Sequence, residues 1–240
     1  MPKIQPKKEY TKVINFYELP EIKKNMTTVS NPGFHLTEIK LPCRMVAVAL
    51  SGGGKTNFVM NFIKYTSVGQ GTFSHIHVYH KIDEELYTHL AEKCGDRITF
   101  YKRLSDLPAA KDLKSDGHQS VIFDDCVADK NQEKISEYFL YGRKINNNLG
   151  CSCIYISQRY FGIPTTVRAQ SNYMILLKIR GFRDLKLILK DANLGIELEE
   201  LEEIYKDATQ NNLDFLKISC VEKDDNKLLS KNFDGFYMLD

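Results

Sequence analysis

The stretch RMVAVALSGGGKT, residues 44–56, combines an apolar run, a glycine-rich turn and the start of a new helix. Residues 44–50 are apolar apart from Arg44, as expected of a buried strand. Three glycines let the backbone turn its N–H groups toward a bound phosphate, and a helix opening at Lys55 adds the positive end of its dipole. This order of elements predicts a phosphate-binding P-loop, the Walker A motif.

The residues of this loop have expected roles in binding Mg²⁺-ATP. Lys55 would bridge the β- and γ-phosphates, and the Thr56 hydroxyl would ligate Mg²⁺. The nucleotide contacts are predicted at Ser51, Gly52, Gly53, Gly54, Lys55, Thr56 and Asn57. The usual pattern has glycine where this chain has Ala49, so full catalytic competence depends on whether the alanine is tolerated.

A second apolar run ends in two acids, VIFDD at residues 121–125, and predicts a Walker B strand. Asp124 is expected to hold Mg²⁺, and Asp125 to polarise the attacking water. Adjacent side chains on a strand point in opposite directions, so Asp125 must lie where the strand is already ending. The alternative is that the two acids cap the following helix.

Polar residues near a further apolar run, residues 151–157, extend the predicted catalytic set. Gln158 follows that strand and could orient water, since ligands gather at the carboxyl ends of parallel strands. An arginine from a neighbouring subunit could stabilise the transferring phosphoryl group. Arg143 is the first choice, followed by Arg168 and then Arg159; each has a surface or structural role as its alternative.

The alternation of apolar runs and amphipathic stretches predicts the fold class. Further strands are expected over residues 75–79, 97–101 and 173–178, and helices over 55–65, from Asp83 to Gly95, from Asp129 onward, and over 196–206. Together with the P-loop, strands alternating with helices favour a three-layer α/β NTPase fold with a mostly parallel central sheet covered on both faces. Strands over 215–221 and 233–239 are expected to form a C-terminal antiparallel extension.

Composition and charge divide the 240 residues into three expected parts. Residues 1–40 are interpreted as an N-terminal arm, basic through Lys24, residues 41–190 as the ATPase core, and residues 191–240 as an extension of the same domain. The net charge of +2 is too small to indicate a polyanion partner. Six cysteines, four of them in apolar stretches, favour free thiols in a reducing compartment. No signal peptide or membrane-spanning run is expected.

Some polar residues suggest rival interpretations. His75, His77 and His80 invite a metal site, but no acid or cysteine stands at a partnering spacing, so zinc is not expected. Lys102 and Arg103 follow a strand and could contact DNA phosphates, or form a plain solvated pair. No sequence-reading DNA-binding motif is present, so any binding of DNA should be independent of its sequence.

The motifs in chain order resemble the viral genome-packaging ATPases of the FtsK–HerA superfamily, in particular the poxvirus-type enzymes of large DNA viruses, virophages and related elements. The resemblance rests on SGGGKTN, VIFDD and GRKINNNLGCSCIYISQRYFGIPTTVRAQSNY (residues 51–57, 121–125 and 142–173) and spans about residues 40–180. It implies a P-loop NTPase core of the ASCE, RecA-like type, in which the P-loop strand is flanked by the strands bearing the acid pair and the glutamine. It also implies that Arg143 acts in trans.

The same resemblance implies a biological setting. It implies a homo-oligomeric ring, a hexamer or pentamer, that hydrolyses ATP and threads double-stranded DNA into a preformed capsid, with capsid protein as a partner. It places the chain in the host cytoplasm or virus factory, or packaged in the virion.

Two rivals remain: a nucleotide kinase, which needs an arginine-rich lid, and a nucleotide-binding assembly factor that does not hydrolyse ATP.

Overall fold

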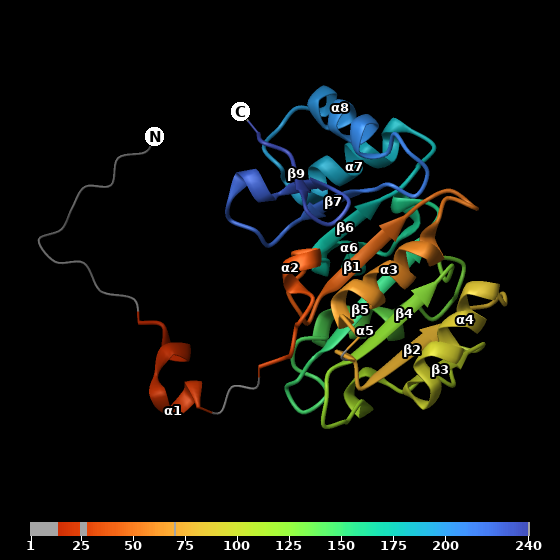
Figure 1. Cartoon of the computed structure of the whole chain (residues 1–240), viewed down its shortest axis with the longest axis vertical. Helices are drawn as coiled ribbons and strands as arrows, with labels where there is room; N and C mark the ends of the chain where they lie inside the picture. Colours follow the sequence, from red (N-terminus) through yellow and green to blue (C-terminus); the bar gives the residue numbers. More distant parts are fainter. Residues whose placement is uncertain (1–13, 25–27, 70, 240) are drawn as a thin grey trace, which may run out of the picture.

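The computed structural model describes residues 14–24, 28–69 and 71–239, so that residues 1–13 and 25–27 of the expected N-terminal arm lie outside the described residues. Within the described residues the strands form one sheet of nine, in the order β3-β2-β4-β5-β1-β6-β7-β8-β9 (Figure 1). The strands are β1 (Arg44–Val48), β2 (His75–Tyr79), β3 (Ile98–Tyr101), β4 (Gln119–Asp124), β5 (Cys151–Ser157), β6 (Tyr173–Leu176), β7 (Leu216–Ser219), β8 (Leu229–Lys231) and β9 (Gly235–Phe236).

Helices cover both faces of the sheet (Figure 1). The helices are α1 (Pro20–Lys23), α2 (Phe34–Thr37), α3 (Lys55–Ser67), α4 (Glu85–Cys94), α5 (Gln132–Tyr141), α6 (Thr165–Gln170), α7 (Phe182–Ala192) and α8 (Leu198–Ala208). Side chains of α3 and α4 belong to one apolar cluster, and side chains of α5 to α8 belong to another on the opposite face. None of the helices described is long and apolar enough to cross a bilayer.

The central strand β1 shows why its sequence is apolar throughout. Val46 and Val48 belong to the cluster on the α5–α8 face, while Met45 and Ala47 belong to the cluster under α3 and α4. Successive side chains of a strand point to opposite faces. When both faces are covered, both sets of side chains are buried, so polar and apolar residues do not alternate. The predicted three-layer α/β fold with a mostly parallel sheet is confirmed.

One expectation about strand order was wrong. The P-loop strand β1 pairs with β5 and β6, and the acid-bearing strand β4 lies one position further, on the far side of β5. Both β1 and β4 are parallel to β5. As a result, the residues that follow β5 lie between the P-loop and the acids, at the shared carboxyl edge of the sheet.

Two helix starts also differ from expectation, because acids expected to cap helices have other partners. Helix α4 begins after Glu84, while Asp83 pairs with Lys102. Helix α5 begins after Asn131, whose side chain accepts a hydrogen bond from the backbone N–H of Lys134. Asp129 instead accepts a hydrogen bond from Tyr79 (2.8 Å).

The C-terminal extension is antiparallel, as predicted, but its strands are shorter than expected. Strand β7 occupies the middle of the expected run 215–221, and the expected run 233–239 contains only β9. Buried Lys217 donates from its ammonium to the backbone carbonyls of Thr37 and Phe233. This contact joins the extension to the segment 28–40, which includes the fully buried Ile39.

Candidate nucleotide site

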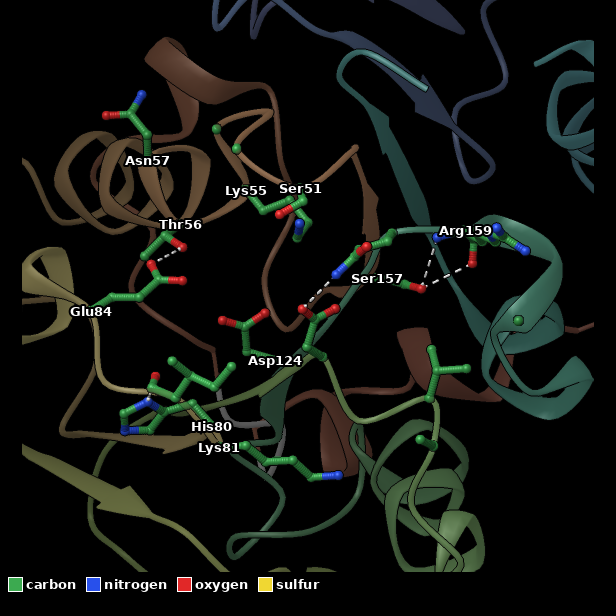
Figure 2. Close-up of a pocket in the computed structure, with 18 of the residues that line it drawn as sticks. Ser51, Lys55, Thr56, Asn57, His80, Lys81, Glu84, Asp124, Ser157 and Arg159 are labelled. Atoms are coloured by element: carbon green, nitrogen blue, oxygen red, sulfur yellow. Dashed lines mark hydrogen bonds between the residues drawn. The ribbon is translucent and has the colours of Figure 1, made fainter. Parts of the chain in front are cut away.

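A cavity of about 1070 Å³ opens at the carboxyl edge of the sheet, beside the P-loop (Figure 2). It is lined by Ser51, Gly52, Gly54, Lys55, Thr56, Asn57, His80, Lys81, Ile82, Glu84, Leu86, Asp124, Asp125, Val127, Ala128, Ser157, Gln158, Arg159, Phe161 and Gly162. Figure 2 shows Ser51 and Lys55 on one side of this cavity, with Asp124 facing them and Thr56 and Glu84 beside it. The residues therefore come from segments following β1, β2, β4 and β5.

The loop backbone has the conformation that its glycines permit. Gly52 and Gly54 have φ of +70° and +87°, in the left-handed region that favours glycine. Gly53 has a different requirement, since a Cβ placed on it would lie 2.9 Å from the Leu50 carbonyl oxygen and 3.0 Å from the Ala49 Cβ. The fully buried Ala49 is thus accommodated in this conformation, provided that glycine stands opposite it.

The two polar residues that follow the glycines are almost buried and are hydrogen-bonded. The Lys55 ammonium donates to the carbonyl of Leu50 at 3.2 Å. The Thr56 hydroxyl donates to a carboxylate oxygen of Glu84 at 2.6 Å. Glu84, at the N-cap position of α4, is a site residue that sequence reasoning missed. The signal was the acidic run Asp83–Glu85, which follows a parallel strand and so lies at the ligand-binding edge.

Asp124 ends strand β4 and is only 7% exposed. Burial raises the pKa of this carboxyl group, and nearby Asp125 and Glu84 raise it further. Two partners oppose the rise in pKa: a hydrogen bond from the Tyr87 hydroxyl (2.7 Å) and the charge of Lys55. Tyr87 is the second site residue that the sequence did not reveal, because only the packing of α4 brings it to β4.

Asp125 adopts a left-handed backbone conformation with φ of +49°. This residue lies just past the end of β4, and the turn brings it to the same cavity as Asp124, as the strand geometry required. A carboxylate oxygen of Asp125 accepts a hydrogen bond from the Gln158 side-chain amide at 3.0 Å. The acid and the glutamine thus form one polar pair, and the P-loop opens into the same cavity.

The oxygen atoms in this cavity fit a magnesium ion bound together with phosphates. In the described ranges no group of three His, Cys, Asp or Glu side chains could hold a metal ion by itself. Thr56, Glu84 and Asp124 nevertheless present a hydroxyl and two carboxylates, the hard oxygen ligands that Mg²⁺ prefers. Mg²⁺ is usually held by only one or two protein ligands, and phosphates and water supply the others.

The three candidate arginines lie in different places. Arg143 follows α5, and the carbonyl of the preceding residue, Gly142, accepts a hydrogen bond of 2.7 Å from the N–H of Cys151, which begins β5. It is therefore at the amino edge of the sheet, away from the cavity of its own chain. Arg168 forms an ion pair with Asp191 (2.9 Å) on the α5–α8 face. Arg159 alone of the three lines the cavity (Figure 2).

Other residues considered from the sequence have local partners. His77 lies between Tyr101 and Gln119, and its hydrogen bonds to both are 2.9 Å long. Lys102 pairs with Asp83 and Arg103 with Asp106, so each cation has an acidic neighbour on the surface. The cysteines at 43, 126, 151 and 153 are buried free thiols, as expected for cysteines in apolar stretches.

Comparisons with known proteins were made by sequence and by structure. No protein-family model matches the chain, and the search of curated proteins also gave no match. The genome packaging NTPase B204 from Sulfolobus turreted icosahedral virus 2, solved with ATP-gammaS, matches with a TM-score of 0.55 and 17% identity over 81% of this chain and 98% of that one. The same enzyme solved with AMP gives a TM-score of 0.53 and 18% identity, covering 80% and 98% of the two chains.

B204 from Sulfolobus Turreted Icosahedral Virus, described as a DNA-packaging ATPase, gives a TM-score of 0.54 and 17% identity over 81% of this chain and 98% of that one. At such low identities the likeness concerns the fold. It extends over nearly the whole length of those enzymes. The chain therefore has the α/β P-loop fold of these viral genome-packaging NTPases, as its motifs predicted.

Proposed function

We propose that this chain is an ATP-hydrolysing motor that moves double-stranded DNA into a preformed capsid. The observation that supports this most is the convergence of Lys55, Thr56, Asp124, Asp125 and Gln158 on one cavity at the carboxyl edge of the sheet. A nucleotide hydrolase needs these groups together. The shared fold with viral genome-packaging NTPases supports the choice of DNA packaging among the reactions of P-loop enzymes.

In the proposed reaction, water attacks the γ-phosphate of ATP directly and ADP leaves. The loop N–H groups and Lys55 hold the phosphates, and Lys55 neutralises charge that develops during transfer. Asp125 and Gln158, already hydrogen-bonded to each other, position the attacking water, and the Asp125 carboxylate accepts its proton. These roles follow from the chemistry of each group and its place in the cavity.

Thr56 and Asp124 would hold Mg²⁺, and Glu84 is placed to orient the Thr56 hydroxyl. When bound, this ion supplies positive charge to the phosphate oxygens. Nearby acids make it costly to ionise Asp124, and a divalent cation beside the carboxylate would reduce that cost. Asp124 must be ionised for this role, so activity is expected to fall at acidic pH.

The position of Arg143 supports assembly into a ring. Arg143 lies at the opposite edge of the sheet from its own cavity, so a contact with nucleotide would require the cavity of a neighbouring subunit. A closed ring, a hexamer or a pentamer, gives every cavity such a neighbour. Hydrolysis would then depend on assembly, and capsid protein would be the partner that receives the DNA.

The decisive test is ATP hydrolysis by the purified chain with and without double-stranded DNA. We expect Mg²⁺-dependent release of phosphate that DNA stimulates. Lys55→Ala is expected to lower the rate about 100-fold or more, because it removes the charge that stabilises the transferring phosphoryl group. Lys64→Ala, on the exposed side of the same helix, serves as the matched control and should retain the parent rate.

Two results would contradict the proposal. Hydrolysis by Lys55→Ala at the parent rate would remove the assigned site. Turnover that ignores DNA and increases with a nucleoside or nucleotide acceptor would instead identify a kinase. A measured mass of the nucleotide-bound assembly checks the ring, since a protein that remains a monomer under conditions of full activity cannot use Arg143 in trans.

A further inference from the structure

A second, smaller cavity adjoins the nucleotide cavity and has an unusual concentration of positive charge. Its volume is about 380 Å³, and it is lined by Leu50, Ser51, Gln158, Arg159, Phe161, Arg180, Gly181, Arg183 and Asp184. Three of these nine residues are arginines. They come from two separate segments, the loop after β5 and the stretch from the turn after β6 into the start of α7, so the fold brings them together.

The three guanidinium groups have no acidic partner among the residues that the structure describes. Among the described residues, the side chains of Arg159 and Arg180 form no hydrogen bond or ion pair. The guanidinium carbon of Arg183 lies 4.3 Å from the centroid of the Phe161 ring. The one acid in the lining is Asp184. Its two carboxylate oxygens accept the backbone N–H groups of Tyr160 and Phe161 at 3.2 and 3.1 Å.

The start of α7 adds to the positive potential of this cavity. Gly181 is the N-cap of this eleven-residue helix and supplies no side-chain cap, so N–H groups of the first turn remain available to a ligand. The helix dipole also favours negative charge at this end. An anion in the cavity would thus meet guanidinium groups and helix N–H groups together.

The exposure of these side chains indicates which kind of anion fits. Arg159, Arg180 and Arg183 are all exposed, and Phe161 is 58% exposed at the rim. A site for a small free anion usually encloses it with buried donors, whereas exposed arginines spread over a surface suit an extended polyanion. Arginines contacting phosphates hold a nucleic acid without reading its bases.

We propose that Arg159, Arg180 and Arg183 bind the phosphate backbone of double-stranded DNA beside the nucleotide cavity, and that this contact positions Gln158 for hydrolysis. Gln158 lines both cavities and is hydrogen-bonded to Asp125. The backbone of Arg159 is held to the Ser157 hydroxyl by two hydrogen bonds, at 2.9 and 3.2 Å. A phosphate drawn toward Arg159 therefore acts on the residues directly flanking Gln158. The inference rests on the proposed function, which supplies DNA as the partner.

The test uses the full chain and the double variant Arg180→Ala/Arg183→Ala, which leaves the residues of the nucleotide cavity intact. Binding of a labelled DNA duplex is measured at several salt concentrations, along with ATP affinity and ATP hydrolysis with and without duplex. We expect duplex affinity to fall about tenfold or more and the slope of log affinity against log salt to decrease by about 2, since each arginine that is removed neutralises one phosphate. ATP affinity and the rate without DNA should stay unchanged, while DNA no longer stimulates hydrolysis.

The control variant is Lys186→Ala/Lys190→Ala, which removes two exposed cations from α7 outside the cavity. It should behave as the parent chain does in every measurement. Thermal melting of both double variants verifies that they are folded, as expected for changes at exposed side chains.

Several results would overturn the inference. Unchanged duplex affinity and salt slope in the arginine variant would exclude a DNA contact, as would a parent chain that binds no duplex. A weakened affinity for ATP with intact duplex binding would assign the arginines to the nucleotide. Stimulation of the parent enzyme by tripolyphosphate equal to that by duplex would indicate a site for free anions. The parent chain could also bind duplex but hydrolyse no ATP, while the arginine variant binds duplex more weakly. In that case the motor proposal fails and the DNA site stands.

Discussion

Asp124 shows at the scale of one residue how a buried site balances opposing effects. Burial and the neighbouring acids raise the pKa of its carboxyl group, while the Tyr87 hydroxyl and Lys55 lower it. The two side chains that lower the pKa come from α4 and α3, which are far from β4 in sequence. The ionised carboxylate that the proposed reaction needs thus depends on side chains that only the fold supplies.

The Tyr87→Phe variant tests this balance. Removing the hydroxyl removes a hydrogen bond to the ionised carboxylate, so the pKa of Asp124 should rise further. Since Asp124 acts when ionised, the acidic limb of the pH–rate profile of ATP hydrolysis should move to higher pH, with a smaller effect on the rate at alkaline pH. Tyr79→Phe, which removes a similar hydrogen bond to Asp129, is the control and should leave that limb in place. Identical acidic limbs for parent and Tyr87→Phe would show that Asp124 does not control the profile.

At the scale of elements, the loop after β5 is held by the helix that follows β6. Asp184 in the first turn of α7 accepts two backbone N–H groups from the short 3-10 helix Tyr160–Gly162. Helix α7 and this loop lie next to each other because β1 alone separates β5 from β6 in the sheet. The geometry of the segment after Gln158 therefore depends on a helix that begins only after the next strand of the chain.

We expect Asp184→Ala to lower the free energy of unfolding by about 1–3 kcal/mol, because two backbone N–H groups are left without their acceptor. Urea denaturation of parent and variant measures the difference. Asp184→Asn keeps one acceptor oxygen and should be less destabilised. Equal stability of parent and Asp184→Ala would mean that water satisfies the loop as well as the carboxylate does.

Prediction from sequence succeeded best for elements whose pattern is local. The predicted bounds of the strands at 75–79 and 151–157 agree with the observed ones, since apolar runs between turns identify these strands. Helices α6 and α7 were not expected; α6 lies within the stretch 142–173, which was interpreted as a family motif. Asp129 failed as a helix start, because a tertiary partner, Tyr79, was better placed than the helix N–H groups.

At the scale of the whole molecule, Lys217 joins parts of the chain that are distant in sequence. It is 1% exposed, and its ammonium donates to carbonyls before β1 and after β8. Burial lowers the pKa of this lysine from 10.5 to about 8. The folded chain therefore binds this proton less tightly than the unfolded chain does.

The consequence is a pH dependence of stability with a defined sign. Between about pH 8 and 10.5 the unfolded chain keeps the proton that the folded chain releases, so this residue makes the free energy of unfolding rise with pH. Compared with Lys217→Met, the parent should gain up to about 3 kcal/mol across this range. Urea denaturation at a series of pH values gives the difference, in which other titrating groups cancel. A constant difference would show that Lys217 stays protonated in the fold.

Local sequence was enough to predict the fold class, the P-loop and the acid pair, because glycine conformation, strand burial and helix dipoles act over a few neighbouring residues. It also placed Gln158 at the end of its strand. Only the folded chain shows that β5 lies between β1 and β4, that Glu84 and Tyr87 reach the candidate site, and that three arginines gather beside it. These contacts join segments tens of residues apart, and side-chain packing between helices and sheet, which no local pattern encodes, brings them together.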